Sequence, residues 1–300
     1  MQTKRIKRRI NGVLLLDKPS GISSNQALQQ AKRLFQAEKA GHTGSLDPLA
    51  TGLLPLCFGE ATKFSHFLLD ADKSYRAWIK LGVTTTTGDA EGEVIQVLPV
   101  SLMREQIETA LARFMGEIAQ VPPMYSALKH QGKPLYTYAR EGIDIDRKAR
   151  NVVIHAITLE RFDHDELEIV VKCSKGTYIR TLAEDIGNTL GCGGHLVGLR
   201  RLSTGDFELQ QGLTLEQIEA LPLAERDLQL LGADALISGL PEVVLDEEST
   251  YYLQRGQRVW KPGSIPKGQF RLYGPGHVFL GIGEQMQDGK IAPKRLVQVS

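Results

Sequence analysis

The C-terminal fifth of the chain is broken into short segments by recurrent glycine, and this pattern limits its fold more than any other feature. From Pro241 onward, glycine separates short apolar stretches at eight positions, namely Gly256, Gly263, Gly268, Gly274, Gly276, Gly281, Gly283 and Gly289. Short strands joined by such turns are typical of a small β-barrel. We therefore place a domain boundary near residue 240, with a larger unit over 1–240 and a small β-rich unit over 241–300.

Strand and helix patterns are mixed in the larger unit. Apolar alternation or short apolar runs predict strands over residues 12–19, 74–83, 152–159 and 167–173. Apolar residues at helical spacing predict helices over 24–34, 62–69, 102–115 and 178–190, the last ended by Gly191. We expect a loop over 41–52, a turn over 88–92, an exposed insertion over 121–150 and helical pieces in the connecting segment 208–240.

Composition excludes several classes of protein. Hydrophobic residues make up 42% of the chain and charged residues 24%, which excludes a disordered or fibrous chain. No apolar run approaches the ~20 residues of a membrane span, and the run at 13–16 is too short for a signal peptide. The three cysteines, Cys57, Cys173 and Cys192, are scattered, so no disulfide framework or cysteine-rich zinc site is expected. These features predict a cytoplasmic protein.

Charge is segregated along the chain although its net value is only +1. Residues 208–248 hold ten acidic residues against one base, whereas residues 251–300 hold eight bases against two acids. Five further bases lie in the first nine positions. Separate basic regions favour a polyanionic partner, and nucleic acid is the leading class. The alternative for any single basic cluster is that its charges only keep the surface soluble.

The segment 41–52, GHTGSLDPLATG, combines turn-forming residues with ionisable ones. Gly41 and Gly44 permit a close backbone approach, and Pro48 stiffens the chain directly after Asp47. His42 lies five residues before this carboxylate. Spacing alone leaves two interpretations open, a catalytic carboxylate on a rigid turn or an Asx turn in which Asp47 bonds its own backbone.

The same segment resembles the catalytic-aspartate motif of the TruB family of pseudouridine synthases, which isomerise the uridine at position 55 in the T loop of tRNA. Other segments agree in the same order: GVLLLDKPSGISS at 12–24, KSYRAWIKLGVTTTTGDAEG at 73–92, PPMYSALKHQGKPLYTYAREG at 122–142, CSKGTYIRTLAEDIG at 173–187, HLVGLRR at 195–201 and GIGEQMQDGKIAPKRLV at 281–297. The resemblance covers nearly the whole chain. It implies an α+β fold, in which 1–240 form a catalytic domain with a mixed, largely antiparallel sheet flanked by helices. Residues 241–300 would form a PUA-like, RNA-binding pseudo-barrel.

The resemblance implies catalytic roles for three residues. Asp47 matches the essential carboxylate of the family, and whether it adds to the base, attacks C1′ or removes a sugar proton stays open. Arg180 matches the guanidinium that keeps this carboxylate ionised against the effect of burial. Tyr75 matches the tyrosine that stacks on the flipped uracil and is placed to take its C5 proton. Without the resemblance, a tyrosine on an alternating strand indicates core packing.

Substrate-binding roles follow in the same way. Tyr178 and Leu199 match residues that pack against the base, and His42 matches the residue that fills the space left by the flipped base. The reaction is an isomerisation, so no cofactor and no metal are expected. The acidic residues Asp89, Glu91 and Glu93 lie beside Gly88 and Gly92, and we interpret them as a solvated hairpin turn rather than a metal site.

The partner implied by the resemblance is the T-arm stem-loop of tRNA, without a guide RNA or a membrane, bound by a monomer. The insertion 121–150 holds six bases and three tyrosines, which predicts either a mobile flap that orders on RNA or a rigid excursion that contacts nothing. A non-catalytic RNA-binding protein or a tRNA folding chaperone is the alternative from another class. Asp47, Tyr75 and Arg180 together argue against binding as the sole role, and a chaperone activity beside catalysis stays open.

Overall fold

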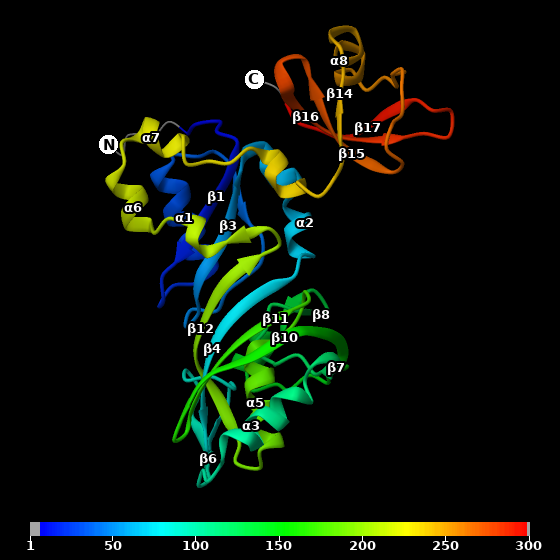
Figure 1. Ribbon diagram of the computed structural model, residues 1–300. Helices are drawn as coiled ribbons and strands as arrows, with labels where there is room; N and C mark the ends of the chain where they lie inside the picture. Colours follow the sequence, from blue (N-terminus) through cyan, green and yellow to red (C-terminus); the bar gives the residue numbers. More distant parts are fainter. Residues whose placement is uncertain (1–6, 299–300) are drawn as a thin grey trace.

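The computed structural model describes residues 7–298 and is built around one long, twisted sheet (Figure 1). Its strands follow the order β1-β3-β12-β4-β11-β10-β7, and β2 and β13 pair at its sides. In that order the bounds are Gly12–Lys18, Thr51–Phe58, Gly194–Thr204, Lys73–Leu81, Glu166–Cys173, Arg150–Asp163 and Gly116–Gln120, with β2 at Ala40–His42 and β13 at Phe207–Glu208. All pairs are antiparallel except β3 with β12. The expected α+β fold with a mixed, largely antiparallel sheet is therefore confirmed.

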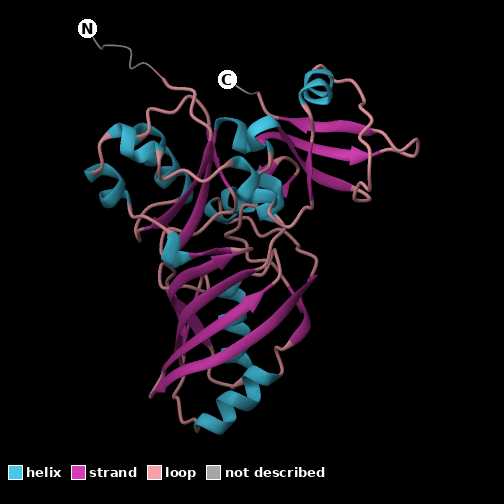
Figure 2. Cartoon of the chain, turned by 45° about the horizontal axis from the view of Figure 1, so that its top comes forward, coloured by secondary structure: helices cyan, strands magenta, loops and turns pink. Residues whose placement is uncertain are grey.

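Helices pack against this sheet (Figure 2). Their apolar side chains form common buried clusters with those of the strands. The α-helices are α1 at Ser24–Leu34, α2 at Ser65–Leu69, α3 at Arg104–Ala112, α4 at Leu135–Arg140, α5 at Ile179–Thr189, α6 at Leu215–Ala220, α7 at Leu223–Asp227 and α8 at Glu247–Gln254. Short 3₁₀ segments are η1 at Gly59–Lys63, η2 at Leu209–Gln211, η3 at Ala233–Ile237 and η4 at Pro275–His277. Helix α5 contributes Leu182 and Ile186 to the same core as Ala77 of β4 and Ile169 of β11. This packing fixes the start of α5 beside the centre of the sheet.

The C-terminal segment forms a second sheet, in the order β14-β15-β16-β17. Its strands are Glu242–Val244, Gln269–Gly274, Val278–Gln285 and Ile291–Leu296, and α8 lies between the first two in the chain. This sheet contacts the larger unit directly. The rings of Phe64 and Phe279 meet edge to face at 5.6 Å, and the Tyr273 hydroxyl donates to Asp234 at 2.8 Å. The expected β-rich C-terminal region is present and shares apolar packing with the rest of the chain.

Five strands of the central sheet were not predicted, namely the long strands β3 and β12 and the short strands β2, β7 and β13. Strand β3 is buried at seven of its eight positions, so it lacks the alternation of a half-exposed strand. In β12 burial alternates over residues 198–203, but the buried positions include the polar residues Arg201 and Ser203, so the apolar residues do not alternate. Because β2 and β3 extend into the expected loop 41–52, the irregular part is confined to residues 43–50. The helix expected over 62–69 is divided between η1 and α2.

Two short hairpins complete the fold. Strand β5 (Val83–Thr85) pairs with β6 (Val94–Val97), and β8 (Lys129–His130) pairs with β9 (Lys133–Pro134) inside the insertion 121–150. Of the bases near the N-terminus, Lys4 and Arg5 lie outside the described residues. Within residues 7–298, no helix combines the length and apolar character that crossing a membrane requires.

Candidate active site

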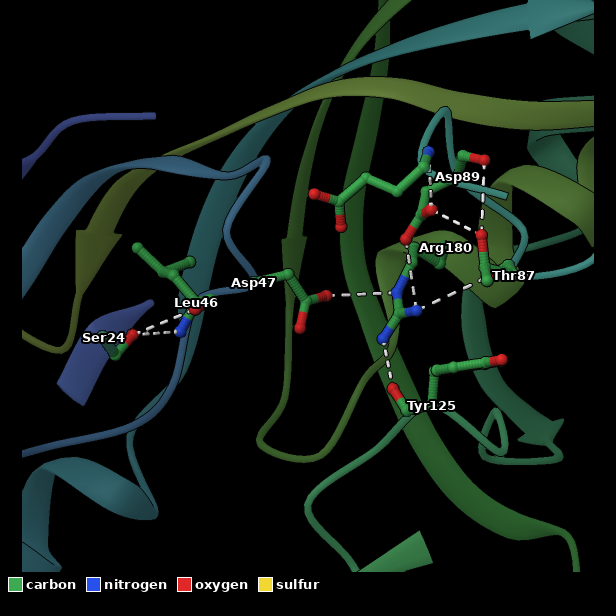
Figure 3. A network of polar contacts seen from close by, with 8 residues as sticks. Ser24, Leu46, Asp47, Thr87, Asp89, Tyr125 and Arg180 are labelled. Carbon is green, nitrogen blue, oxygen red and sulfur yellow. Dashed lines mark hydrogen bonds and ion pairs between the residues drawn. The ribbon is translucent and has the colours of Figure 1, made fainter. Parts of the chain in front are cut away.

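The loop 43–50 is held by hydrogen bonds on both sides of Asp47. The Ser24 hydroxyl, at the start of α1, donates to the Leu46 carbonyl at 3.0 Å and accepts from the Leu46 amide at 2.7 Å (Figure 3). The Gly21 amide donates to the Pro48 carbonyl at 2.9 Å. Because both neighbours of Asp47 are anchored to the segment before α1, its backbone position is set by contacts across the fold.

Buried Lys18 braces the segment that anchors this loop. Its side chain is fully buried, and its ammonium donates to the carbonyls of Pro19 at 2.8 Å and Ile22 at 2.6 Å. Burial lowers the pKa of Lys18 to about 8, although the nearby Asp47 carboxylate acts to raise it. These contacts tie the Lys18 side chain to the main chain of residues 19–22, the segment that includes Gly21.

Arg180, in the first turn of α5, joins two carboxylates (Figure 3). Its Nε lies 3.1 Å from Asp47 Oδ2, and its Nη1 lies 3.2 Å from Asp89 Oδ2. The guanidinium also donates to the carbonyls of Tyr125 at 2.6 Å and Thr87 at 3.4 Å. The Arg180 side chain is only 7% exposed, whereas that of Asp47 is 47% exposed and therefore open to a ligand. The interpretation of Asp47 as a simple Asx turn does not describe this arrangement, since its carboxylate faces Arg180.

Opposing influences act on the ionisation of Asp47. Partial burial in the site is the largest and raises the pKa of this carboxyl above its ordinary value. The Arg180 guanidinium lowers the pKa of Asp47, Asp89 raises it again, and Lys18 lowers it. The net direction is upward, so Arg180 and Lys18 offset part of the desolvation that would otherwise favour the neutral acid.

A cavity of about 320 Å³ opens directly beside Asp47. Tyr75, Tyr178 and Leu199 line it together with Arg180, so the structure brings five of the six predicted site residues to one place. Tyr75 is 8% exposed and lies on β4, and burial raises the pKa of its phenol. A cavity with an aromatic ring, an aliphatic wall and a carboxylate can enclose one planar, partly polar group.

A wider cleft of about 890 Å³ adjoins this cavity and shares Asp47 and Arg180 with it. His42, the sixth predicted residue, lines the cleft rather than the inner cavity. Burial and the charge of Arg201 lower the pKa of His42, which favours the neutral imidazole. Tyr136 and Arg140 of the insertion form another part of the cleft wall.

Asp89 does not lie in a solvated turn as predicted. It is 2% exposed and bound to Arg180, whereas Glu91 and Glu93 in the same segment are exposed as expected. Asp89 is buried because the hairpin folds it inward against α5. A buried carboxylate requires a cationic partner, and Arg180 supplies it. No feature of the sequence separates Asp89 from the two acids that follow it.

Sequence reasoning also missed residues that position Tyr178. Gln120, at the end of β7, is 1% exposed, and its side chain accepts from the Tyr178 amide at 2.7 Å and donates to its carbonyl at 3.0 Å. Ser126 of the insertion is buried and acts to lower the pKa of Tyr178, which burial raises. The insertion is thus a wall of the site as well as a surface feature. Across residues 7–298, no three His, Cys, Asp or Glu side chains are grouped closely enough to hold a metal ion.

Comparison with known proteins gives consistent matches over the whole chain. Residues 32–179 match the N-terminal domain of TruB family pseudouridylate synthases, 180–245 match the tRNA pseudouridylate synthase B C-terminal domain, and 241–297 match the pseudouridine synthase II TruB C-terminal region. A protein of Methylobacillus flagellatus named tRNA pseudouridine synthase B is 64% identical, with 99% of each chain covered. One of the same name from Nitrosospira multiformis is 54% identical over 97% of each chain.

Solved structures show the same fold. A chain from an H/ACA RNP bound to a substrate RNA containing 2′-deoxyuridine superposes with a TM-score of 0.72 at 22% identity, covering 96% of this chain and 85% of the other. A chain of an archaeal Nop10-Cbf5 complex gives a TM-score of 0.69 at 23% identity, with the same coverage of each chain.

Proposed function

This chain belongs to the TruB family of pseudouridylate synthases and makes pseudouridine in tRNA, and on that premise we propose that it acts on uridine 55 of the T loop. The observation that carries the proposal is the pairing of Asp47 with Arg180 at the mouth of a cavity lined by Tyr75. An anchored, partly open carboxylate beside a cavity for a planar ring suits chemistry at a glycosidic bond.

The proposed reaction begins with extrusion of the target nucleotide. The flipped uracil enters the cavity and stacks on Tyr75, with Tyr178 and Leu199 on its other sides, which offsets part of the cost of unstacking. His42 lies in the outer cleft, where it fills the space that the base leaves. In the proposed arrangement the sugar lies beside the Asp47 carboxylate.

Asp47 then acts at the glycosidic bond as an ionised carboxylate. Arg180 keeps it ionised and fixes its orientation, because the guanidinium is itself held by Asp89 and by two main-chain carbonyls. The N1–C1′ bond breaks, the base turns within the site, and C5 joins C1′. Atoms and electrons balance within the substrate, so the proposed mechanism uses no redox cofactor, ATP or metal.

RNA recognition is proposed to extend along the cleft. Tyr136 and Arg140 of the insertion 121–150 line the cleft beside Asp47, and this supports contact with the T-arm stem-loop. The 241–300 unit, proposed as a PUA-like RNA-binding domain, carries exposed Arg255 and Arg258. We further propose that a monomer acts on tRNA without a guide RNA.

The test uses the purified full-length protein and an unmodified T-arm stem-loop. Asp47→Asn removes the charge and keeps the shape, so pseudouridine formation is expected to fall below a few per cent of wild type while stem-loop binding persists. Asp165→Asn is the matched control, because Asp165 forms an exposed ion pair with Lys80 on the sheet surface. Substantial turnover by the Asp47 variant, or no pseudouridine at position 55 with the wild-type protein, would refute the proposal.

A further inference from the structure

Arg201 is a buried cation without a compensating carboxylate. It lies on β12 directly opposite Tyr75 of β4, and it is 1% exposed. Its Nε donates to the Leu53 carbonyl at 2.6 Å, but its Nη2 has no hydrogen-bond partner. Within the described part of the chain, no Asp or Glu oxygen lies within 4.0 Å of the guanidinium, although such pairs are found for Arg180 and Arg200.

Folding alone does not account for such a residue. An uncompensated buried charge opposes folding, and apolar residues of similar volume often replace buried ions without loss of stability. Buried donors without partners are rare in native proteins and point to a ligand or a reactive role. The orphaned Nη2 therefore indicates a partner that the folded chain does not supply.

The surroundings of Arg201 indicate where that partner binds. Arg201 lines the inner cavity, whose wall holds one carboxylate, Asp47, against the cations Lys73, Arg180 and Arg201. Asp47 is already paired with Arg180, and the Lys73 ammonium donates to three main-chain carbonyls, those of Leu68, Leu69 and Ala71. Arg201 is the member of this set whose donors are least satisfied.

The field of Arg201 reaches across the cavity. Burial is the largest cause of the lowered pKa values of Lys73 and His42, and the charge of Arg201 lowers both further. Arg201 also acts to lower the pKa of the Tyr75 phenol, through its charge and a side-chain hydrogen bond, against the larger effect of burial. A guanidinium has five donors and no acceptor, so it can only be matched by an oxygen or a negative charge. The missing partner is therefore an acceptor-rich or anionic group of the substrate.

We propose that Arg201 contacts the base: its guanidinium donates to a ring carbonyl oxygen of the flipped uracil and balances the negative charge of the ring after the glycosidic bond breaks. This inference rests on the proposed function. When N1–C1′ cleaves heterolytically, the electron pair stays on the ring and its charge spreads to the carbonyl oxygens. The C5–C1′ bond then forms from the ring electrons, C5 loses a proton and N1 gains one, so no external reactant is needed.

The test compares two variants that both keep a donor for the Leu53 carbonyl. Arg201→Gln is neutral and Arg201→Lys is charged. Arg201→Gln is expected to slow single-turnover pseudouridine formation on saturating stem-loop by about 100-fold, the usual effect of losing one preorganised donor. Arg201→Lys should remain within about tenfold of wild type, because charge is kept and only the fork geometry is lost. The melting temperature of Arg201→Gln should be no lower than that of wild type, since an uncompensated charge is removed.

Arg200→Gln is the control on the same strand, because Arg200 is paired with Asp17 and is not a residue of the inner cavity. It should retain the wild-type rate. The assignment would be overturned if Arg201→Gln and Arg201→Lys slowed the reaction equally, or if Arg201→Gln kept the wild-type rate. It would also be overturned if the melting temperature of Arg201→Gln fell far enough to account for the lower rate. An inactive wild-type protein would instead refute the proposed function, so the two failures are distinguishable.

Discussion

Replacing Asp89 by Asn tests whether the second carboxylate on Arg180 positions the first. Asp89 Oδ1 accepts from the Thr87 hydroxyl at 2.6 Å and from the Glu91 amide at 3.1 Å, while Oδ2 faces Arg180 Nη1 at 3.2 Å. An asparagine can keep both contacts of Oδ1. Its amide nitrogen then replaces Oδ2 and places a donor against a donor of Arg180.

The loss of stability in Asp89→Asn depends on which partners Arg180 keeps. Removing one partner of a buried ion pair costs about 3–5 kcal/mol when the other charge is left alone. In Asp89→Asn, Arg180 keeps its contacts with Asp47 and with two main-chain carbonyls. We therefore expect the free energy of unfolding to fall by about 2 kcal/mol, near the value of one charged hydrogen bond. The guanidinium should shift toward Asp47, and a displacement on the order of 1 Å can cost 10²-fold in rate. We expect single-turnover pseudouridine formation to slow by about 10- to 100-fold.

The pH dependence of the rate gives a second test, because it predicts the direction of a pKa shift. Asp89 raises the pKa of Asp47, so removing its charge should lower that pKa. The acidic limb of the rate profile, where Asp47 becomes protonated, should therefore move to lower pH in Asp89→Asn even though the maximal rate falls. Stability is measured by urea unfolding, and Asp165→Asn at the Lys80 ion pair should leave it nearly unchanged, because solvent screens that pair. A wild-type rate, or an acidic limb displaced to higher pH, would contradict the reasoning.

Three further predictions concern other parts of the molecule. Burial raises the pKa of Glu184 to about 7. The folded state therefore binds a proton at Glu184 more tightly than the unfolded state does. As a result, stability falls as the pH rises from the ordinary carboxyl range to 7. Glu184→Gln should therefore be more stable than wild type at pH 8, by about 1 kcal/mol after solvent screening, and not at pH 4, as thermal melting at both pH values would show. Replacing Arg255, Arg258 and Lys261 by Gln should weaken tRNA binding. It should also reduce the slope of the logarithm of the binding constant against the logarithm of the salt concentration by up to about 3. An unchanged slope in filter binding would exclude these residues from phosphate contacts. Binding of the stem-loop should protect residues 121–150 from limited proteolysis, and unchanged cleavage would argue against ordering of the insertion on RNA.

Local patterns in the chain determined several helices and strands and the position of the main loop. The apolar spacing of α1 and α5, the alternation of β4 and the glycine-broken C-terminal strands depend on neighbours in sequence, so periodicity predicts them. The GHTGSLDPLATG segment predicted the rigid turn around Asp47 for the same reason, because its turn residues act over a few positions, whereas only the resemblance to the TruB family singled out the carboxylate. Strand β3 escaped prediction because burial on both faces removes the alternation that marks a half-exposed strand. Strand β12 escaped it because polar residues, Arg201 and Ser203, occupy buried positions.

Only the tertiary structure decided which charges face one another. Arg180 and Asp89 are 91 residues apart in the chain, and Asp89 has the same local surroundings as Glu91, which remains exposed. Likewise, adjacent Arg200 and Arg201 read alike in sequence, yet one pairs with Asp17 and the other is buried with an unpartnered donor. The state of a charge depends on its solvation and on the carboxylates within a few ångströms, and these are set by segments that meet only when the sheet closes.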